Sequence, residues 1–156
     1  MTIDIDTLLP MHRNAFAYWQ QLAGKGTSPL RSDFDPFAIP YVLPHVIMTN
    51  VVDRGRDFQF RVFGQAVLDR LNNNYTGMFL SELPDQEKRQ KVWQSYRTVA
   101  ATGEPLRSAL EYTGPYENIS VAEELYLPFF QTGGDICSIL VVVAFDNSGK
   151  PPSRRY

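Results

Sequence analysis

The chain has 156 residues, of which 44% are hydrophobic and 13% aromatic, and its formal net charge is −2. This length fits one domain, which buries roughly 70% of its unfolded surface, and the composition excludes a largely disordered chain. Lysine and arginine are scattered, so no nucleic acid and no anionic membrane surface is predicted as a partner. The single cysteine, Cys137, excludes an internal disulfide framework. Without a secretory leader or a long apolar span, we expect no membrane insertion and a cytoplasmic protein.

The first predicted element is an amphipathic helix over residues 7–23. Thr7 is the expected cap, and Pro10 falls in the first turn, where a missing N–H is tolerated. Gly24 and Gly26 are expected to end the helix. Its apolar residues recur at steps of three and four: Leu8, Met11, Ala15, Trp19 and Leu22.

A proline-rich connector and two strands come next. Residues 31–44 hold three prolines at four-residue spacing, which allow only short turns, one of them capped by Asp35. Residues 46–53 are mostly β-branched and apolar, and residues 57–63 alternate between apolar and polar. The alternation predicts one face of the second strand that carries Phe58, Phe60 and Val62.

The middle of the chain is predicted to be helical. A short helix over residues 66–71 should stop at three consecutive asparagines, because Asn tolerates the left-handed conformation that ends helices. A longer helix should run over residues 85–102, with Asp85 as N-cap and Gly103 after its end. Its apolar stripe consists of Val92, Trp93, Tyr96, Val99 and Ala100.

Three strands are predicted for the second half, over residues 106–112, 123–130 and 136–145. The last of them is apolar on both faces apart from Ser138, which indicates a central strand covered on both sides. The helices between residues 65 and 102 can cover one side. The N-terminal helix can cover the other, either in its own chain or in a partner chain, and the second arrangement predicts a homodimer through this helix.

The order of these elements and four groups of residues resemble stand-alone bacterial PAS domains over about residues 31–146. The groups are Phe34-Asp-Pro36 to Leu43-Pro44, Asp57 to Gly64, Thr76-Gly77 followed by Leu80 to Leu83, and Leu125 to Pro128 before Gly133-Gly134. The resemblance implies an α+β PAS fold, with a five-stranded antiparallel sheet, helices on one face and the N-terminal helix on the other. It also implies a side pocket and a signalling role. The expected division is an N-terminal helical segment (1–30), the PAS domain (31–146) and a mobile tail (147–156).

No cofactor is predicted. A haem-binding PAS domain usually supplies an axial histidine from its long helix, but the only histidines here are His12 and His45, in the N-terminal helix and the connector. A covalent flavin needs a reactive cysteine in the short helices before the long one. Cys137 lies in the last strand instead and is interpreted as a small buried hydrophobe. Neither haem nor covalent flavin is therefore expected.

The acidic residues show no pattern of a metal site or of an acid–base pair. Glu82, Asp85 and Glu87 coincide with the start of the long helix, where negative charge favours the helix dipole. Glu123 and Glu124 are interpreted as the exposed start of a strand. We therefore predict no metal site and no catalytic residue.

A pocket between the sheet and the long helix is predicted from aromatic residues and from isolated polar residues on apolar elements. Core packing is the simpler interpretation of the aromatic residues, whereas Ser108 and Ser138 need hydrogen-bond partners if buried. The candidate pocket residues are Phe60, Val62, Trp93, Tyr96, Ser108, Leu110, Leu127 and Ser138.

The predicted function is a sensory or docking module rather than an enzyme. It would act through contacts with a histidine kinase or another PAS protein, with or without a small bound ligand. The alternative is a small pocket enzyme of the ketosteroid-isomerase or cyclase type. Such an enzyme needs an ionisable group of shifted pKa in its pocket, and no Asp or His is expected on the apolar strand faces.

Overall fold

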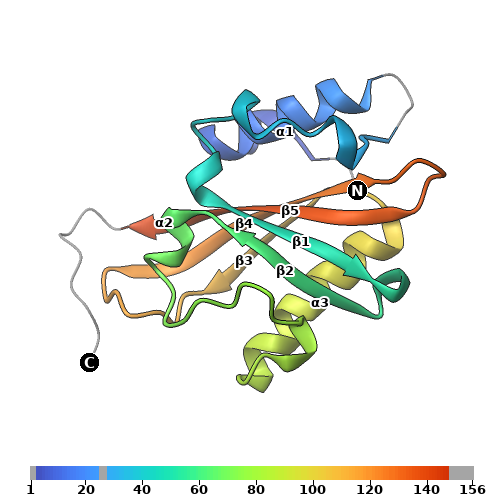
Figure 1. Cartoon of the computed structure of the whole chain (residues 1–156). Coiled ribbons are helices and arrows are strands. Elements are labelled where there is room, and N and C mark those ends of the chain that lie inside the picture. Colours follow the sequence, from blue (N-terminus) through green and yellow to red (C-terminus); the bar gives the residue numbers. More distant parts are fainter. Residues whose placement is uncertain (1–2, 25–27, 148–156) are drawn as a thin grey trace.

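A five-stranded antiparallel sheet forms the centre of the computed structural model, which describes residues 3–24 and 28–147 (Figure 1). Its strand order is β2-β1-β5-β4-β3, so the last strand is central, as predicted. The strands are β1 (Val46–Val52), β2 (Asp57–Phe63), β3 (Leu106–Glu111), β4 (Ile119–Phe130) and β5 (Ile136–Asn147). The main helices are α1 (Pro10–Ala23), α2 (Gln65–Leu68) and α3 (Gln86–Thr102).

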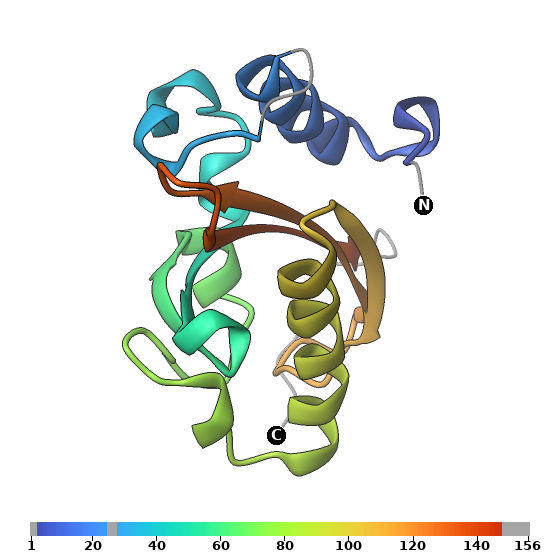
Figure 2. The ribbon, with the colours of Figure 1, turned by 90° about the vertical axis from the view of Figure 1, so that its right-hand side faces the viewer.

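Helices cover both faces of the sheet, as Figure 2 shows: α1 and the connector lie on one face, α2 and α3 on the other. Leu140 and Val142 of β5 join the core under α1, and Ile139 and Val141 join the core under α3. Successive side chains of a strand point to opposite faces, so a strand between two cores is apolar throughout. The prediction of a doubly covered central strand is confirmed.

Helix α1 packs on the sheet of its own chain, which answers the question that the sequence left open. His12 Nε2 donates a hydrogen bond to the Val142 carbonyl at 3.0 Å, and Trp19 Nε1 donates to the Pro128 carbonyl at 2.7 Å. Both bonds tie α1 to the two central strands. The homodimer through this helix stays a prediction, because covering the sheet does not require a second chain.

The start of α1 differs from the prediction, although Pro10 does occupy its first turn and Gly24 does follow its end. The N-cap is Leu9, and no side chain caps the helix. Thr7 lies in a preceding 3-10 turn, where its hydroxyl donates to the Asp4 carbonyl and accepts from Arg107. The predicted Thr7 cap is therefore wrong. Gly26 lies outside the described residues.

The connector forms short 3-10 turns, at Arg31–Asp33, Pro36–Ala38 and Leu43–His45. Asp35 caps the second turn, where its carboxylate accepts a hydrogen bond from the Phe37 amide at 3.0 Å. The prediction of an ordered connector with a cap at Asp35 is confirmed.

A β-bulge in β2 changes the face on which Val62 lies. Met48 pairs with Val62, but the next residue of β1, Thr49, pairs with Phe60, which leaves Arg61 as the extra residue. A bulge shifts the alternation of the strand by one position. Phe60 therefore packs under α3, whereas Val62 points to the face of α1 and the connector and is 52% exposed. The prediction that Phe58, Phe60 and Val62 share one face is wrong for Val62.

Helix α3 begins and ends where the sequence predicts. The Asp85 carboxylate accepts from the Lys88 amide at 3.1 Å, and Gly103 takes the left-handed conformation after the last turn. Of the predicted stripe, Val92, Tyr96 and Val99 are buried, and the other two residues are half-buried.

Asp85→Ala is expected to lower the free energy of unfolding by about 1 kcal/mol, because the first turn of α3 loses its cap. Chemical denaturation measures this loss. Gln86→Ala is the control, since Gln86 is exposed and makes no capping bond, and it should change stability by less than about 0.5 kcal/mol. Equal effects of the two substitutions would contradict the capping role.

Other boundaries differ from the prediction by a few residues. β4 starts at Ile119 rather than at residue 123, because the stretch before Glu123 continues the pairing with β3, where Val121 faces Glu111. β3 ends one residue early, and α2 has only four residues. The predicted tail, residues 147–156, lies outside the described residues except for Asn147 at the end of β5.

Candidate functional site

A cavity of about 210 Å³ lies between the sheet and α3 and is bordered by α2, the loop that follows α2 and the loop that follows β3. Its walls are mainly apolar, and polar groups come from the start of α3 and from β4. The apolar lining includes Ile47, Phe60, Phe63, Val67, Leu71, Val92, Leu110, Val143 and Phe145. Mostly apolar walls with a few polar groups are typical of small-molecule sites.

Three of the predicted pocket residues line this cavity: Phe60 from β2, Tyr96 from α3 and Leu110 from β3. They come from elements that are distant in the sequence, and the sheet brings them together. The structure places all three on the wall of this cavity. Their contact with a ligand stays a prediction.

Trp93 of α3 and Ser108 of β3 lie where the helix meets the sheet, but outside the cavity wall. The Trp93 ring packs edge-on against Phe58, with 5.8 Å between the ring centroids. Ser108 Oγ lies 3.5 Å from Ser95 Oγ, a long contact between hydroxyls. Both residues hold α3 on the sheet, so their predicted place in the pocket is corrected.

Val62, Leu127 and Ser138 lie on the opposite face of the sheet. Leu127 is buried in the core under α1, and Ser138 pairs with Phe129, which belongs to the same core. Val62 borders a separate groove of about 580 Å³ along the connector. Alternate residues of a strand face opposite sides of the sheet, and the strand register and the bulge in β2 place these three on the side away from the pocket.

Glu124 is the pocket residue that the sequence analysis missed. It was expected at an exposed strand start, but β4 begins five residues earlier and Glu124 is only 8% exposed. It lines the cavity together with Ala122, two positions before it. Counting back by two from the buried Tyr126 would have placed Glu124 on the pocket face.

Among the described residues, the hydrogen-bond partner of the Glu124 carboxyl is the Tyr126 hydroxyl, which donates to Oε1 at 2.9 Å. Burial raises the pKa of Glu124 to about 7, while the Tyr126 hydrogen bond and the charge of Lys88 act in the opposite direction. Burial thus favours the protonated form of this carboxyl more than it is favoured in an exposed glutamate. The sequence analysis expected no Asp or His on the apolar strand faces and placed Glu124 at an exposed strand start, so it did not predict this ionisable group in the pocket.

Two buried tyrosines stand beside Glu124. The Tyr96 and Tyr126 rings meet edge-on at 5.2 Å, and the Tyr96 hydroxyl lies 2.9 Å from the Thr49 hydroxyl. Burial raises the pKa of both phenols, so both stay neutral. They supply hydrogen bonds and no charge to this end of the site.

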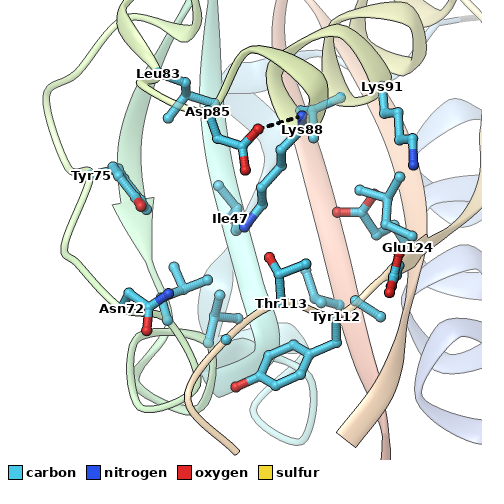
Figure 3. A pocket seen from close by; sticks show the side chains of 18 of the residues that line it. Ile47, Asn72, Tyr75, Leu83, Asp85, Lys88, Lys91, Tyr112, Thr113 and Glu124 are labelled. Carbon is cyan, nitrogen blue, oxygen red and sulfur yellow. Dashed lines mark hydrogen bonds between the residues drawn. The ribbon is translucent and has the colours of Figure 1, made fainter. Parts of the chain in front are cut away.

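Figure 3 shows the charged side chains that surround the pocket opening. Lys88 and Lys91 come from the first turns of α3, directly after its N-cap Asp85. Lys91 Nζ lies 3.7 Å from a Glu87 carboxylate oxygen. The Lys88 side chain reaches from α3 into the pocket.

Within residues 3–24 and 28–147, no group of three or more His, Cys, Asp or Glu side chains is placed to hold a metal ion. His12 is buried on the α1 face, and His45 lies at the end of the connector. Cys137 is half-buried in β5, rather than buried as predicted. The absence of haem and of covalent flavin stays an expectation.

A five-stranded antiparallel sheet with helices and a side pocket is the arrangement expected of a PAS domain, a sensory or signalling type of domain. Comparison with protein families bears this out: residues 9–144 match the PAS domain family, and the chain belongs to it. The match includes α1 as well as the five strands. No curated protein and no solved structure gives a significant match. Of the helices that the structure describes, none has the length and apolar character needed to cross a membrane.

Proposed function

We propose that this PAS domain is a sensor that binds a small, largely apolar molecule in the pocket under α3 and passes the signal on through protein contacts. The observation that carries the proposal is the cavity of about 210 Å³, which has apolar walls and a buried carboxyl group. Typical pockets for drug-sized ligands measure roughly 300–1,000 Å³, so the ligand is a small metabolite.

The proposed contacts with a partner protein follow from the family to which the chain belongs. PAS domains mediate protein interactions, and a sensor without catalytic groups can act only by changing its contacts when the ligand binds. A histidine kinase, another PAS protein or a second copy of this chain are the proposed partners, in the cytoplasm of a bacterium. The pocket enzyme is the weaker candidate. Although Glu124 and Lys88 supply ionisable groups, the other charged side chains of the lining are exposed: Asp85, Glu87, Lys91 and Glu111.

Native mass spectrometry tests the proposal. The purified protein should carry a small molecule that is lost on denaturation, and the same spectrum reports the oligomeric state. Ala122→Leu should remove the bound molecule, because Ala122 lines the cavity and a larger side chain fills it. Ala109→Leu is the matched control, since Ala109 is exposed on β3 and should leave binding intact.

A bound mass that survives Ala122→Leu would place the ligand elsewhere and contradict the proposal. If the wild-type protein carries no molecule, a metabolite library is screened by thermal shift. The absence of any metabolite whose effect depends on Ala122 would also contradict the proposal. Turnover of an isomerase or hydratase substrate would favour the enzyme instead.

A further inference from the structure

Two side chains of opposite charge in the pocket have binding capacity that the described part of the chain does not use: Glu124 and Lys88. The other charged side chains of the lining are engaged or exposed. Asp85 caps α3, and Lys91 pairs with Glu87. The last, Glu111, is exposed on β3 next to the pocket-lining Leu110.

Glu124 is the acceptor of this pair. Its Oε1 accepts from the Tyr126 hydroxyl, but among the described residues Oε2 has no hydrogen-bond partner. A carboxylate can accept about four hydrogen bonds, and an ionised carboxylate that is mostly buried needs donors or a cation. Glu124 is 8% exposed and lines the cavity wall, so a donor in the pocket can reach its carboxylate.

Lys88 is the donor of the pair. It is half-buried, and in the part of the chain that the structure describes its ammonium group has no hydrogen bond or ion pair. Its charge is near enough to Glu124 to influence that carboxyl, but the two do not form an ion pair. The side chain reaches into the pocket in Figure 3. A lysine carries its charge on a flexible four-carbon stem, so it can follow an anionic group within the cavity.

We propose that the ligand is a small zwitterion with an apolar body, such as an apolar amino acid, held by Glu124 at its ammonium group and by Lys88 at its carboxylate. The apolar body would lie against Phe60, Phe63 and Phe145, which line the same cavity. This inference rests on the proposed function and names the chemical class of its ligand.

A ligand with only one of the two charges fits the site less well. A simple amine would pair with Glu124 but would bring a second cation near Lys88. A simple carboxylic acid would pair with Lys88 but would leave the Glu124 carboxyl without a donor and bring a second acid close to it. The amine and the carboxylic acid each place a charged group near a like charge or leave a buried group unpaired. Such unfavourable interactions with the wrong ligand make a pocket specific.

Isothermal titration calorimetry with two probe series tests the proposal. The first series is L-phenylalanine, 2-phenylethylamine and 3-phenylpropionate, and the second is L-leucine, 3-methylbutylamine and 4-methylpentanoate. In at least one series the amino acid should bind about tenfold or more tightly than the amine and the acid of the same body, because each of these loses one charge-assisted contact. An amine or acid that binds as tightly as its amino acid in both series would overturn the proposal.

Substitutions at the two residues assign each charge. Glu124→Gln and Lys88→Met should each weaken amino-acid binding by about tenfold or more. In Glu124→Gln, the amino acid should also bind no more tightly than the carboxylic acid with the same apolar body. Arg97→Met is the control, because Arg97 is exposed on α3 and lies outside the cavity lining, and it should leave the affinity unchanged. Thermal melts verify that each variant is folded. Unchanged affinity in folded Glu124→Gln or Lys88→Met would overturn the proposal.

The failure of this inference can be told apart from that of the proposed function. If no probe binds but native mass spectrometry shows a molecule that Ala122→Leu displaces, the pocket is a ligand site and the zwitterion is wrong. If no probe binds and no Ala122-dependent ligand is found by mass or by screening, both proposals are wrong.

Discussion

Phe129→Ala is expected to lower the free energy of unfolding by about 3–5 kcal/mol, the usual loss for a buried phenylalanine. Phe129 is completely buried in β4, and its ring meets the Phe34 ring of the connector edge-on at 5.4 Å. It fills the space between the sheet and the N-terminal layer, so truncation leaves a cavity there. Urea denaturation followed by circular dichroism measures the loss.

Phe37→Ala is the control for this substitution, because it makes the same change in the same layer. Phe37 is 84% exposed, and its truncation should alter stability by less than about 0.5 kcal/mol. If Phe129→Ala lost no more stability than Phe37→Ala, the connector would not be part of the cooperative core. The expected result agrees with the family match, which begins at residue 9 and includes α1.

Glu124→Gln is expected to remove a pH dependence of stability of about 2–3 kcal/mol between pH 5 and pH 8. Burial raises the pKa of Glu124 from 4.5 to about 7, so between these values the folded protein binds more protons than the unfolded chain. The contribution of this group to stability therefore falls as pH rises through this window and levels off at about pH 8, one unit above the pKa in the folded protein. Glutamine has the same shape and does not titrate. The free energy of unfolding of the variant should therefore increase relative to that of the wild type as pH rises.

Denaturation curves of wild type and variant at each pH measure this difference. His12 acts in the opposite direction, because burial lowers its pKa and its protonation in the unfolded chain reduces stability below about pH 6.5. Both proteins contain His12, so its effect cancels in the comparison. Glu123→Gln is the control, since Glu123 is exposed on the adjacent position of β4. Parallel pH profiles of wild type and Glu124→Gln would contradict the raised pKa.

The two proposals meet at the contact between β4 and α3. Glu124 belongs to a central part of the sheet, and Lys88 lies in the first turns of α3 beside the Asp85 cap. A zwitterion that binds both would connect the sheet to the start of the helix. Ligand binding would then bias the position of α3, which is the change in contacts that a partner protein could detect.

The sequence by itself determined the elements whose signals are local. The 3.6-residue periodicity, the Asp85 cap and Gly103 define α3 almost to the residue, because a helix forms its hydrogen bonds within its own segment. The two apolar faces of β5 determined its central place, since only a strand covered on both sides has that composition. The resemblance to PAS domains followed from the order of such elements.

Only the tertiary structure decided which side chains meet in the pocket. Strand faces depend on pairing with another strand: the bulge opposite Met48 turned Val62 away, and the pairing with β3 carried β4 past Glu124, leaving a carboxyl inside the pocket. The sequence also could not decide whether α1 covers the sheet of its own chain or that of a partner, because an amphipathic stripe indicates only that one helix face is buried. Contacts between segments that are distant in the sequence determine these features. The register between two strands depends on both of them, so it cannot be deduced from the sequence of one.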